Sequence, residues 1–338
     1  MNTQDIYITQ PCVAELVAAE LPSLGANEVR VKLCYSTVSS GTERANVLNL
    51  PNTGFDPNHM EQFPIKDLGY SASGTVDAVG EAVTDLQPGD RVAVSWSHHG
   101  QYIQVRRGNV HKLPDSVSLQ DAALFHIGIF PLAAVRKCRV ELGESAIVMG
   151  LGVLGLVAVQ LLRAAGATPI IAVDPIPEKR EKALSIGADF ALDPFDPNFA
   201  QNAKRITGGG AAVGIEVTGI GAGLDGILDC MAKFGRVALL GCTRDKNFTI
   251  DYYRKVHAPG ITLIGAHTAA RPKSESHGGW WTQTDDMQAL LRLHSTRRLT
   301  LATLVDEIHS PTEAPAVYDR LVKEKAFPVV QFDWRTLG

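Results

Sequence analysis

The pattern of apolar and polar residues changes character twice along the chain. Up to about residue 120, short runs of β-branched and alternating apolar residues are separated by turn residues, which is typical of β-strands. Strands are expected at Val29–Tyr35, Gly74–Val79 and Arg91–Ser95, the last one after the turn Gln87–Asp90. This part of the chain is therefore expected to form a small, irregular β-barrel.

Between about residues 121 and 268, apolar strand signals alternate with helix-length runs, which favours a doubly wound parallel sheet. The expected elements are strands at Ala146–Met149, Pro169–Val173, Gly214–Val217, Val237–Leu240 and Ile261–Ile264, and helices at Val153–Ala165 and Pro177–Leu184. The remainder is mixed, with helices expected at Thr284–His294 and Pro315–Lys323 and a strand at Val329–Asp333. We therefore predict an α/β protein in which a domain of residues 121–268 is inserted into one of residues 1–120 and 269–338.

The composition narrows the possible partners and the compartment. Hydrophobic residues make up 45% of the 338 positions and the formal net charge is -4, so neither nucleic acid nor an anionic membrane is expected as a partner. Five scattered cysteines without a Cys-x-x-Cys pair fit free thiols in a reducing compartment. No signal-peptide pattern opens the sequence, and no apolar run has the length of a membrane span. A cytoplasmic protein with a small-molecule substrate is expected.

A glycine-rich turn separates the expected strand at Ala146–Met149 from the helix after it. Gly150, Gly152 and Gly155 have the spacing G-x-G-x-x-G, which suits a tight turn, the close approach of a pyrophosphate and close helix–strand packing. The first amides of such a helix favour phosphate charge. Asp174 ends the next strand at roughly the 20-residue spacing of a carboxylate that binds ribose. The motif predicts a dinucleotide site.

The residues around Asp174 bear on which dinucleotide binds. The carboxylate of Asp174 would repel a 2′-phosphate, so NAD is favoured over NADP. Lys179 and Arg180 lie nearby in the sequence and keep NADP as the less favoured alternative. Residues at the start of the helix and at the ends of later strands complete the predicted cofactor site: Val153, Leu154, Thr218, Leu240, Gly241 and Cys242.

A second glycine frame lies in the first domain. Gly69–Gly74, followed by Gly80 and Val83, keeps the spacing of the zinc alcohol dehydrogenase signature Gly-His-Glu-x-x-Gly-x5-Gly-x-x-Val. Upstream, Ser40–Glu43 stands where those enzymes have Cys-Gly-Thr/Ser-Asp. With Pro88–Val92 and Gly187–Asp189, the chain resembles the medium-chain dehydrogenase/reductase superfamily over nearly its whole length. The resemblance implies a GroES-like catalytic domain, an inserted Rossmann domain, hydride transfer with a nicotinamide, and a homodimer or homotetramer.

The chain departs from the zinc-containing branch of this superfamily at its ligand positions. Ser40 replaces the first cysteine and Tyr70 replaces the histidine, and the third position falls at Phe125 or His126. A lone His126 cannot supply the three protein ligands of a catalytic zinc. The Ser-Ser-Gly-Thr-Glu run more closely resembles zinc-independent members such as the bacteriochlorophyllide dehydrogenase type. The resemblance therefore implies the zinc-independent branch, and no metal is expected.

Without a metal, alcohol oxidation needs a general base and carbonyl reduction needs a general acid at the same place. Tyr70 is the first candidate, because it stands where the metal would be held. A tyrosine with the ordinary pKa of about 10 abstracts a proton poorly at neutral pH, so it needs a neighbouring cation or a relay. His126, Thr42 and Glu43 are candidates for that part. The alternatives are structural: Tyr70 fills the volume of the metal, His126 is an interior residue, and Glu43 forms an ordinary ion pair.

Four further residues are candidate substrate contacts. Ser40 belongs to the altered ligand frame, and His99 precedes a segment that borders the substrate site in this superfamily. Trp280 and Trp281 follow two glycines, and paired aromatic side chains bury flat or sugar-like ligands well. The alternatives are an exposed loop histidine at His99 and an anchor for the packing of the C-terminal part at the two tryptophans.

Three functions follow from these observations. The first is a zinc-independent, NAD-dependent dehydrogenase acting on a secondary alcohol such as a polyol, a sugar or another polar hydroxyl compound. The second is an NAD(P)H-dependent enoyl or quinone reductase, in which Tyr70 donates a hydrogen bond to the carbonyl oxygen. The third is a catalytically inactive, nicotinamide-binding sensor. The polar candidates around Tyr70 favour the first.

Overall fold

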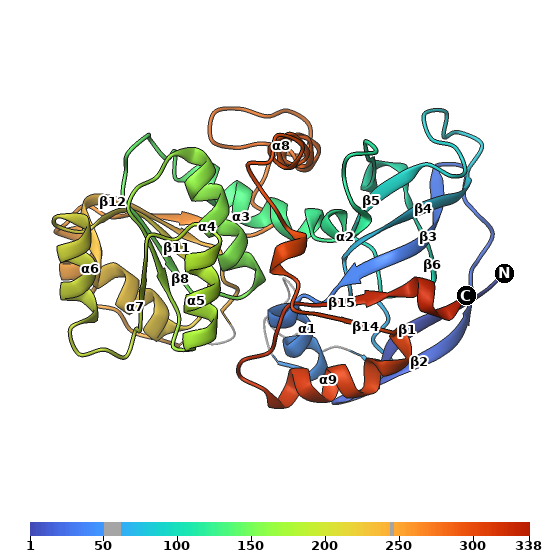
Figure 1. Ribbon diagram of the computed structural model, residues 1–338, viewed down its shortest axis with the longest axis horizontal. Coiled ribbons are helices and arrows are strands. Elements are labelled where there is room, and N and C mark those ends of the chain that lie inside the picture. Colours follow the sequence, from blue (N-terminus) through green and yellow to red (C-terminus); the bar gives the residue numbers. More distant parts are fainter. Residues whose placement is uncertain (51–61, 244–246) are drawn as a thin grey trace. The chain divides into compact units, whose positions relative to one another are not determined.

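The computed structural model describes residues 1–50, 62–243 and 247–338, and its backbone divides into two compact units (Figure 1). Unit 1 comprises Met1–Ile127 and Thr300–Gly338, and unit 2 comprises Gly128–Leu299. The helix Gln283–Ser295, which the sequence assigned to the first domain, groups with unit 2. The domain boundaries near residues 120 and 268 stay a prediction.

Unit 1 is built mainly from strands. Its elements are β1 (Asn2–Gln10), β2 (Val13–Glu20), β3 (Glu28–Thr37), α1 (Ser40–Val47), β4 (Ser71–Val79), β5 (Arg91–Ser95), β6 (Tyr102–Arg106), β7 (Val110–Lys112), α2 (Leu119–Ala122), β14 (Glu307–His309), α9 (Ala314–Lys323) and β15 (Val330–Asp333). In the described residues, β1 pairs with β2, and a larger sheet has the order β14-β15-β3-β4-β5-β7 with β6 also on β3. The pairing of β3 with β4 shifts register twice, which bends the strands and twists the sheet.

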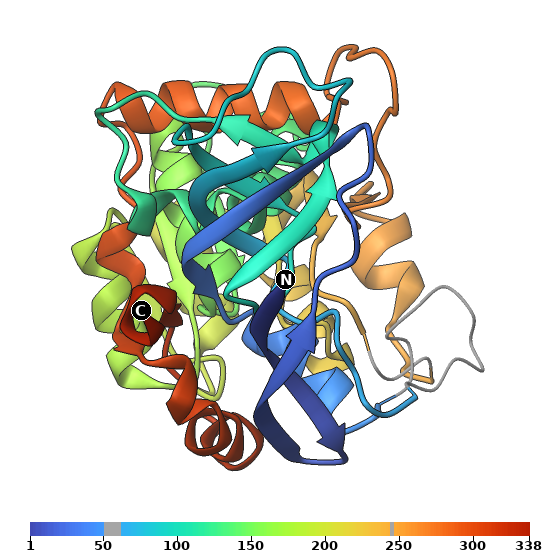
Figure 2. The same cartoon turned by 90° about the vertical axis from the view of Figure 1, so that its right-hand side faces the viewer.

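Helix α9 closes the core of unit 1 from the C-terminal part of the chain. Its buried residues Ala314, Val317, Tyr318 and Leu321 recur at helical spacing and belong to the same apolar cluster as Ile6. The helix packs along β2 of the N-terminal hairpin (Figure 2). This packing carries a tyrosine side chain from the end of the sequence into the interior of unit 1.

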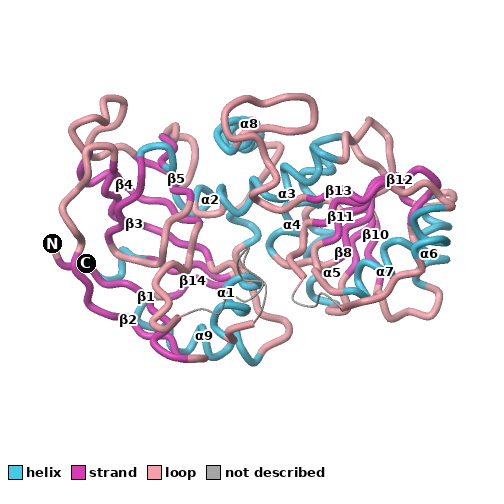
Figure 3. The backbone as a smooth tube through the Cα atoms, turned by 180° about the vertical axis from the view of Figure 1, so that it is seen from behind, coloured by secondary structure: helices cyan, strands magenta, loops and turns pink. Residues whose placement is uncertain are grey.

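Unit 2 is a parallel sheet with helices on both faces (Figure 3). Its elements are α3 (Phe125–Lys137, which begins at the end of unit 1), β8 (Ala146–Met149), α4 (Val153–Ala165), β9 (Ile170–Val173), α5 (Pro177–Ser185), β10 (Phe190–Leu192), α6 (Phe199–Thr207), β11 (Ala211–Glu216), α7 (Gly221–Asp229), β12 (Met231–Leu239), β13 (Thr262–Gly265) and α8 (Gln283–Ser295). In the described part of the chain the order is β10-β9-β8-β11-β12-β13. The chain reverses its direction of winding between β8 and β11, where open α/β sheets bind ligands beyond the carboxyl ends of the strands.

The central strand β8 is buried on both faces, as expected for a strand covered by helices. Ile147 and Met149 belong to the apolar cluster formed with α6 and α7. On the other face, a Cβ added to Gly155 of α4 would lie 3.6 Å from Val148 Cγ1. Nowhere in the described residues is there a helix with the length and apolar character needed to cross a membrane.

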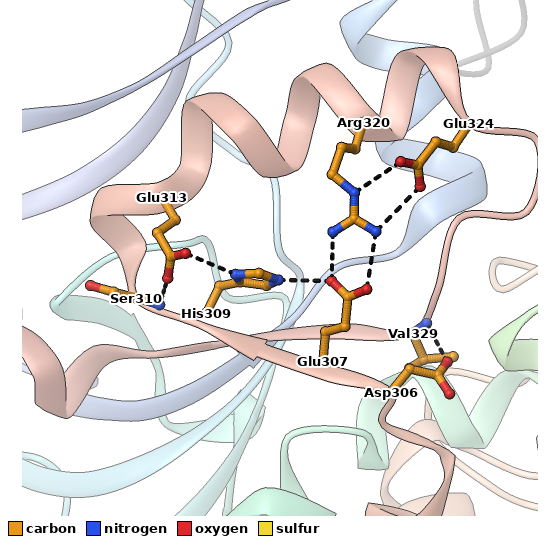
Figure 4. A network of polar contacts seen from close by, with 8 residues as sticks. All are labelled: Asp306, Glu307, His309, Ser310, Glu313, Arg320, Glu324 and Val329. Carbon is orange, nitrogen blue, oxygen red and sulfur yellow. Dashed lines mark hydrogen bonds and ion pairs between the residues drawn. The ribbon is translucent and has the colours of Figure 1, made fainter.

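A network of charged side chains ties β14 to α9 at the surface of unit 1 (Figure 4). Arg320 donates to both carboxylate oxygens of Glu307, at 2.7 and 3.0 Å, and its Nε donates to Glu324 at 3.0 Å. His309 Nε2 lies 2.8 Å from Glu307 and Nδ1 lies 3.2 Å from Glu313. Glu307 and His309 share one face of β14, because they are two residues apart on a strand.

This network is expected to stabilise unit 1 most at mildly acidic pH. Hydrogen bonds from Arg320 lower the pKa of Glu307 to about 2, so its contribution is lost as the pH falls from about 4.5 through that value. Burial opposes the charge of His309, but hydrogen bonds to Glu307 and Glu313 outweigh it and raise the pKa. The contribution of His309 to stability is therefore complete below its ordinary pKa of about 6.5. This contribution is lost as the pH rises through the raised pKa of the folded protein.

The check is the free energy of unfolding of the wild-type protein and of His309→Asn at about pH 5.5 and about pH 9. The difference is expected to stay below about 1 kcal/mol, because the side chains are partly exposed, and to be larger at the acidic pH. A difference that grows at alkaline pH would contradict the assignment.

Candidate active site and dinucleotide site

The glycine turn between β8 and α4 has the geometry that its sequence predicts. Gly150 adopts φ 98°, a left-handed conformation that favours glycine. A Cβ on Gly155 would lie 1.9 Å from the carbonyl oxygen of Gly150, so any side chain there would collide with the turn. A Cβ on Gly152 meets nothing within 4 Å, and this residue is the N-cap of α4. The turn therefore leaves open space at the amide end of the helix, as a pyrophosphate requires.

Asp174 supports this turn from the end of β9. One carboxylate oxygen accepts the backbone N–H of Leu151 at 2.9 Å and the other accepts that of Ile176 at 3.0 Å. Arg180 donates to the backbone carbonyl of Asp174 at 2.6 Å and lies 3.4 Å from Asp193. Asp174 is thus held beside the first residues of the turn, and Arg180 is engaged with carboxylate and carbonyl oxygens.

The loops after β11 and β12 meet the glycine turn. A Cβ on Gly150 would lie 3.0 Å from Thr218 Cγ2, and a Cβ on Gly241 would lie 2.4 Å from the backbone nitrogen of Gly219. Thr218 and Gly241 therefore lie together with the turn at the carboxyl edge of the sheet. Leu240 donates its backbone N–H to the backbone carbonyl of Glu216 at 2.9 Å. Cys242 is exposed.

Glu216, which the sequence analysis did not single out, organises the first of these loops. Its carboxylate accepts the backbone N–H groups of Thr218 and Gly219 and the hydroxyl of Thr218. Burial raises the pKa of Glu216, and the bond from the Thr218 hydroxyl opposes that rise. A buried carboxylate with three donors is a rigid support for the loop that follows β11.

In unit 1, Tyr70 lies among polar and aromatic side chains just before β4. Its hydroxyl is hydrogen-bonded to the hydroxyl of Ser39. The ring of His126 lies edge-on at 5.8 Å between centroids, and that of Trp96 lies at 6.1 Å. The ring centroids of Trp96 and His126 are 4.6 Å apart. The structure thus brings Tyr70 and His126 together and adds Ser39 and Trp96.

Trp96 has two unusual properties for a large aromatic residue. The residue is 48% exposed, and its backbone φ is 55°. A bulky residue with positive φ is strained, and such strain concentrates at functional sites. Trp96 is therefore an exposed aromatic residue near Tyr70.

The first turn of α1 carries the other candidates. Ser40 and Thr42 are partly exposed, in keeping with a position at a site. Glu43 is completely buried, and its Oε1 accepts the backbone N–H of Ser39 at 2.8 Å. Glu43 is therefore an interior anchor for the start of α1, not a group that reaches solvent.

His99 and Glu43 form the centre of a buried polar network. The Tyr318 hydroxyl donates to Glu43 Oε2 at 2.5 Å, and His99 Nε2 lies 3.3 Å from the same oxygen. His99 Nδ1 lies 2.7 Å from the Ser36 hydroxyl, which also accepts the indole N–H of Trp334 at 2.8 Å. Burial and then the neighbouring carboxylate raise the pKa of Tyr318. A fully buried His99 with both ring nitrogens engaged is no substrate contact, and the prediction for it is corrected to an interior role.

Replacing Glu43 with glutamine is expected to lower the free energy of unfolding by about 2 kcal/mol. The amide brings two new N–H groups towards the donors of Tyr318 and His99, so buried donors lose their acceptor. Urea unfolding would measure this loss, with Glu15→Gln on the exposed face of β2 as the matched control. Equal loss in both variants, or none in either, would contradict Glu43 as the acceptor at the centre of the network.

The two tryptophans predicted to contact a substrate pack on basic side chains of α3. The Arg136 guanidinium lies 3.8 Å from the centre of the Trp281 ring, and Lys137 Nζ lies 4.4 Å from that of Trp280. Arg136 also pairs with the buried carboxylate of Asp286. These contacts agree with the alternative that the tryptophans anchor the C-terminal part of unit 2, and their contact with a substrate stays a prediction.

Comparisons with known proteins agree with both units. Residues 25–131 match the family model described as the alcohol dehydrogenase GroES-like domain, and residues 153–278 match that of the zinc-binding dehydrogenase. The chain belongs to the medium-chain dehydrogenase/reductase family. It is therefore an NAD(P)-dependent enzyme of the medium-chain type, and the predicted α/β class with GroES-like and Rossmann domains is confirmed.

Individual relatives differ in how much of the chain they match. D-guloside 3-dehydrogenase of Escherichia coli (strain K12) is 26% identical over 94% of this chain and 96% of the relative. (R,R)-butanediol dehydrogenase of Bacillus subtilis (strain 168) is 36% identical, over 45% of this chain and 52% of the relative. The structure of galactitol-1-phosphate dehydrogenase from Escherichia coli has a TM-score of 0.82 at 22% identity, over 98% of this chain and 99% of that one. This last likeness shows the fold alone.

The residues at the ligand positions of this dehydrogenase do not suit a catalytic zinc. Zinc takes cysteine, histidine and carboxylate ligands, whereas the chain has a hydroxyl at Ser40 and a phenol at Tyr70 that is hydrogen-bonded to Ser39. In residues 1–50, 62–243 and 247–338, no three histidine, cysteine or acidic side chains gather to hold a metal ion. Of the residues at the predicted ligand positions, His126 is the one whose side chain is a usual zinc ligand.

Proposed function

We propose that this dehydrogenase oxidises a secondary hydroxyl of a sugar, glycoside or polyol with NAD and without zinc. The hydrogen-bonded phenol of Tyr70, at the position of a family zinc ligand, is the observation that carries the proposal. As a phenolate, Tyr70 can take the hydroxyl proton of the substrate, and as a phenol it can return that proton to a carbonyl oxygen, so it can act as general base or general acid without a metal. NAD supplies the hydride acceptor when bound.

The substrate class is proposed from two observations of different kinds. Two relatives that match 94% of the chain are named D-guloside 3-dehydrogenase. The exposed aromatic residue Trp96, beside Tyr70 and His126, suits the flat C–H face of a sugar ring. Ser40 and Thr42 add hydroxyl groups at the start of α1 for the polar face of the same ligand.

The preference for NAD is proposed from the surroundings of Asp174. Its carboxylate lies beside the glycine turn, where a 2′-phosphate would be repelled, and Arg180 is already engaged with Asp193. Lys179 is a second basic residue near Asp174 in the sequence. A homodimer or homotetramer, which the resemblance implies, remains part of the proposal, as does a cytoplasmic location, which the scattered cysteines favour.

One experiment separates this proposal from its alternatives. The purified protein is analysed for metal by mass spectrometry, titrated with NADH and NADPH by fluorescence, and assayed on methyl glycosides, sugars, polyols and butanediol. The proposal is supported if the protein is free of zinc, binds NADH more tightly than NADPH and oxidises a glycoside or polyol. Reduction of enones or quinones with NADPH indicates the reductase instead, and NADH binding without any turnover indicates the inactive sensor. Stoichiometric zinc would overturn the metal-free mechanism.

A further inference from the structure

The hydroxyl of Ser39 is directed away from the helix that this residue begins. Ser39 is the N-cap of α1, and a serine there usually accepts a backbone N–H from the first turn. In the described residues its side chain makes no such cap. Its hydroxyl is hydrogen-bonded to the hydroxyl of Tyr70 instead. The Ser39 hydroxyl therefore bonds to Tyr70 and does not stabilise the start of α1 as a side-chain cap.

The backbone of Ser39 is fixed from the interior side. Its N–H is held by Glu43 Oε1 at 2.8 Å, and Glu43 is itself held by Tyr318 and His99. Ser39 is only 5% exposed. Its hydroxyl oxygen therefore has a defined place, within hydrogen-bond reach of the phenol, before any substrate binds.

We propose that Ser39 is a positioning residue that holds the Tyr70 oxygen and donates a hydrogen bond to it when it is a phenolate. This inference rests on the proposed function. In the oxidation, the O–H bond of the substrate breaks and its proton goes to the phenolate oxygen, while the hydride leaves the carbinol carbon for the nicotinamide and C=O forms. Tyr70, which is partly exposed, then returns the proton to water.

The hydrogen bond favours the charged form of the phenol, because a donor stabilises an anion more than a neutral oxygen. In the part of the chain that the structure describes, the titratable ring of His126 and the indole of Trp96 also lie beside Tyr70. The carboxylate of Glu43 is separated from the phenol by Ser39. Of these groups, Ser39 is the one whose hydroxyl is hydrogen-bonded to the reacting oxygen.

The test compares Ser39→Ala, Ser39→Thr and the control Ser73→Ala, a buried serine of β4 whose hydroxyl donates to the backbone of Leu119. Ser39→Ala is expected to lower kcat about tenfold, as for one hydrogen bond to a charged group, with KM for NAD unchanged. The acidic limb of the kcat–pH profile should move up by about one pH unit. Ser39→Thr should restore most of kcat, and Ser73→Ala should stay within about twofold.

Two results would overturn the inference: kcat of Ser39→Ala within twofold of wild type, or a loss that Ser39→Thr does not reverse. If the wild-type protein oxidises no alcohol, the proposed function fails, and ultraviolet titration of tyrosinate decides about Ser39. The difference between wild type and Tyr70→Phe gives the titration of Tyr70. Ser39→Ala should move it to higher pH by about one unit, and an unmoved titration would contradict the hydrogen bond to the phenolate.

Discussion

Tyr70→Phe is expected to lower kcat for alcohol oxidation by about 10²–10⁴-fold, the usual contribution of a general acid–base group. The substitution removes the hydroxyl and with it the hydrogen bond to Ser39. The ring keeps its contacts with His126 and Trp96, so the fold of unit 1 should hold. NADH affinity should not change, because the glycine turn lies in unit 2.

Steady-state kinetics with NAD, together with NADH titration and thermal unfolding, would measure these effects. Tyr35→Phe is the matched control, since the hydroxyl of this tyrosine of β3 accepts a hydrogen bond from Arg335. Tyr35 is not one of the residues described beside Tyr70. If Tyr70→Phe keeps kcat within about threefold of wild type, the phenol is not the acid–base group. Tyr70 would then only fill the volume that a metal occupies in other members of the family, as the structural alternative holds.

The cofactor unit was predictable from the sequence because its signals are local. The strand Ala146–Met149 and the helix Val153–Ala165 form with the expected bounds. Apolar runs of strand and helix length, separated by glycines with fixed spacing, leave few other arrangements. The positive φ of Gly150 and the close approach at Gly155 are the physical reasons for that spacing.

The site of unit 1 was only partly predictable because its contacts are distant in sequence. Glu43 was a candidate for the proton relay and His99 for a substrate contact, but Tyr318 from α9 meets Glu43 across 275 positions of the chain. No local pattern shows that such a partner will close over a carboxylate and bury it. Tyr70 was predictable because it replaces a ligand in a fixed frame.

Ser39 and Trp96 were missed for different reasons. The sequence has two adjacent serines, and the choice between them depends on where α1 begins. The structure makes Ser40 the first helical residue and Ser39 the N-cap, which directs the hydroxyl of Ser39 to Tyr70. Trp96 has a positive φ, and no sequence signal indicates that conformation in a residue other than glycine.

Gly155→Ala and Gly152→Ala are expected to separate folding from cofactor binding. The alanine at position 155 places Cβ 1.9 Å from the carbonyl oxygen of Gly150, so the turn between β8 and α4 must shift. Such overpacking costs about 1–3 kcal/mol or more, which corresponds to a fall in Tm of at least several degrees for a unit of this size. NADH affinity should fall with it, because the displaced turn carries the amides that face the pyrophosphate.

Gly152→Ala should act on binding alone. Its Cβ meets no atom of the protein within 4 Å, so Tm should stay within about 1–2 °C of wild type. The same methyl group would occupy the space through which the pyrophosphate approaches the N-terminus of α4, and NADH affinity should fall about tenfold or more. Thermal unfolding and NADH fluorescence titration on both variants check this. Unchanged NADH affinity in Gly152→Ala would mean that the dinucleotide does not bind across this turn, however stable the variant is.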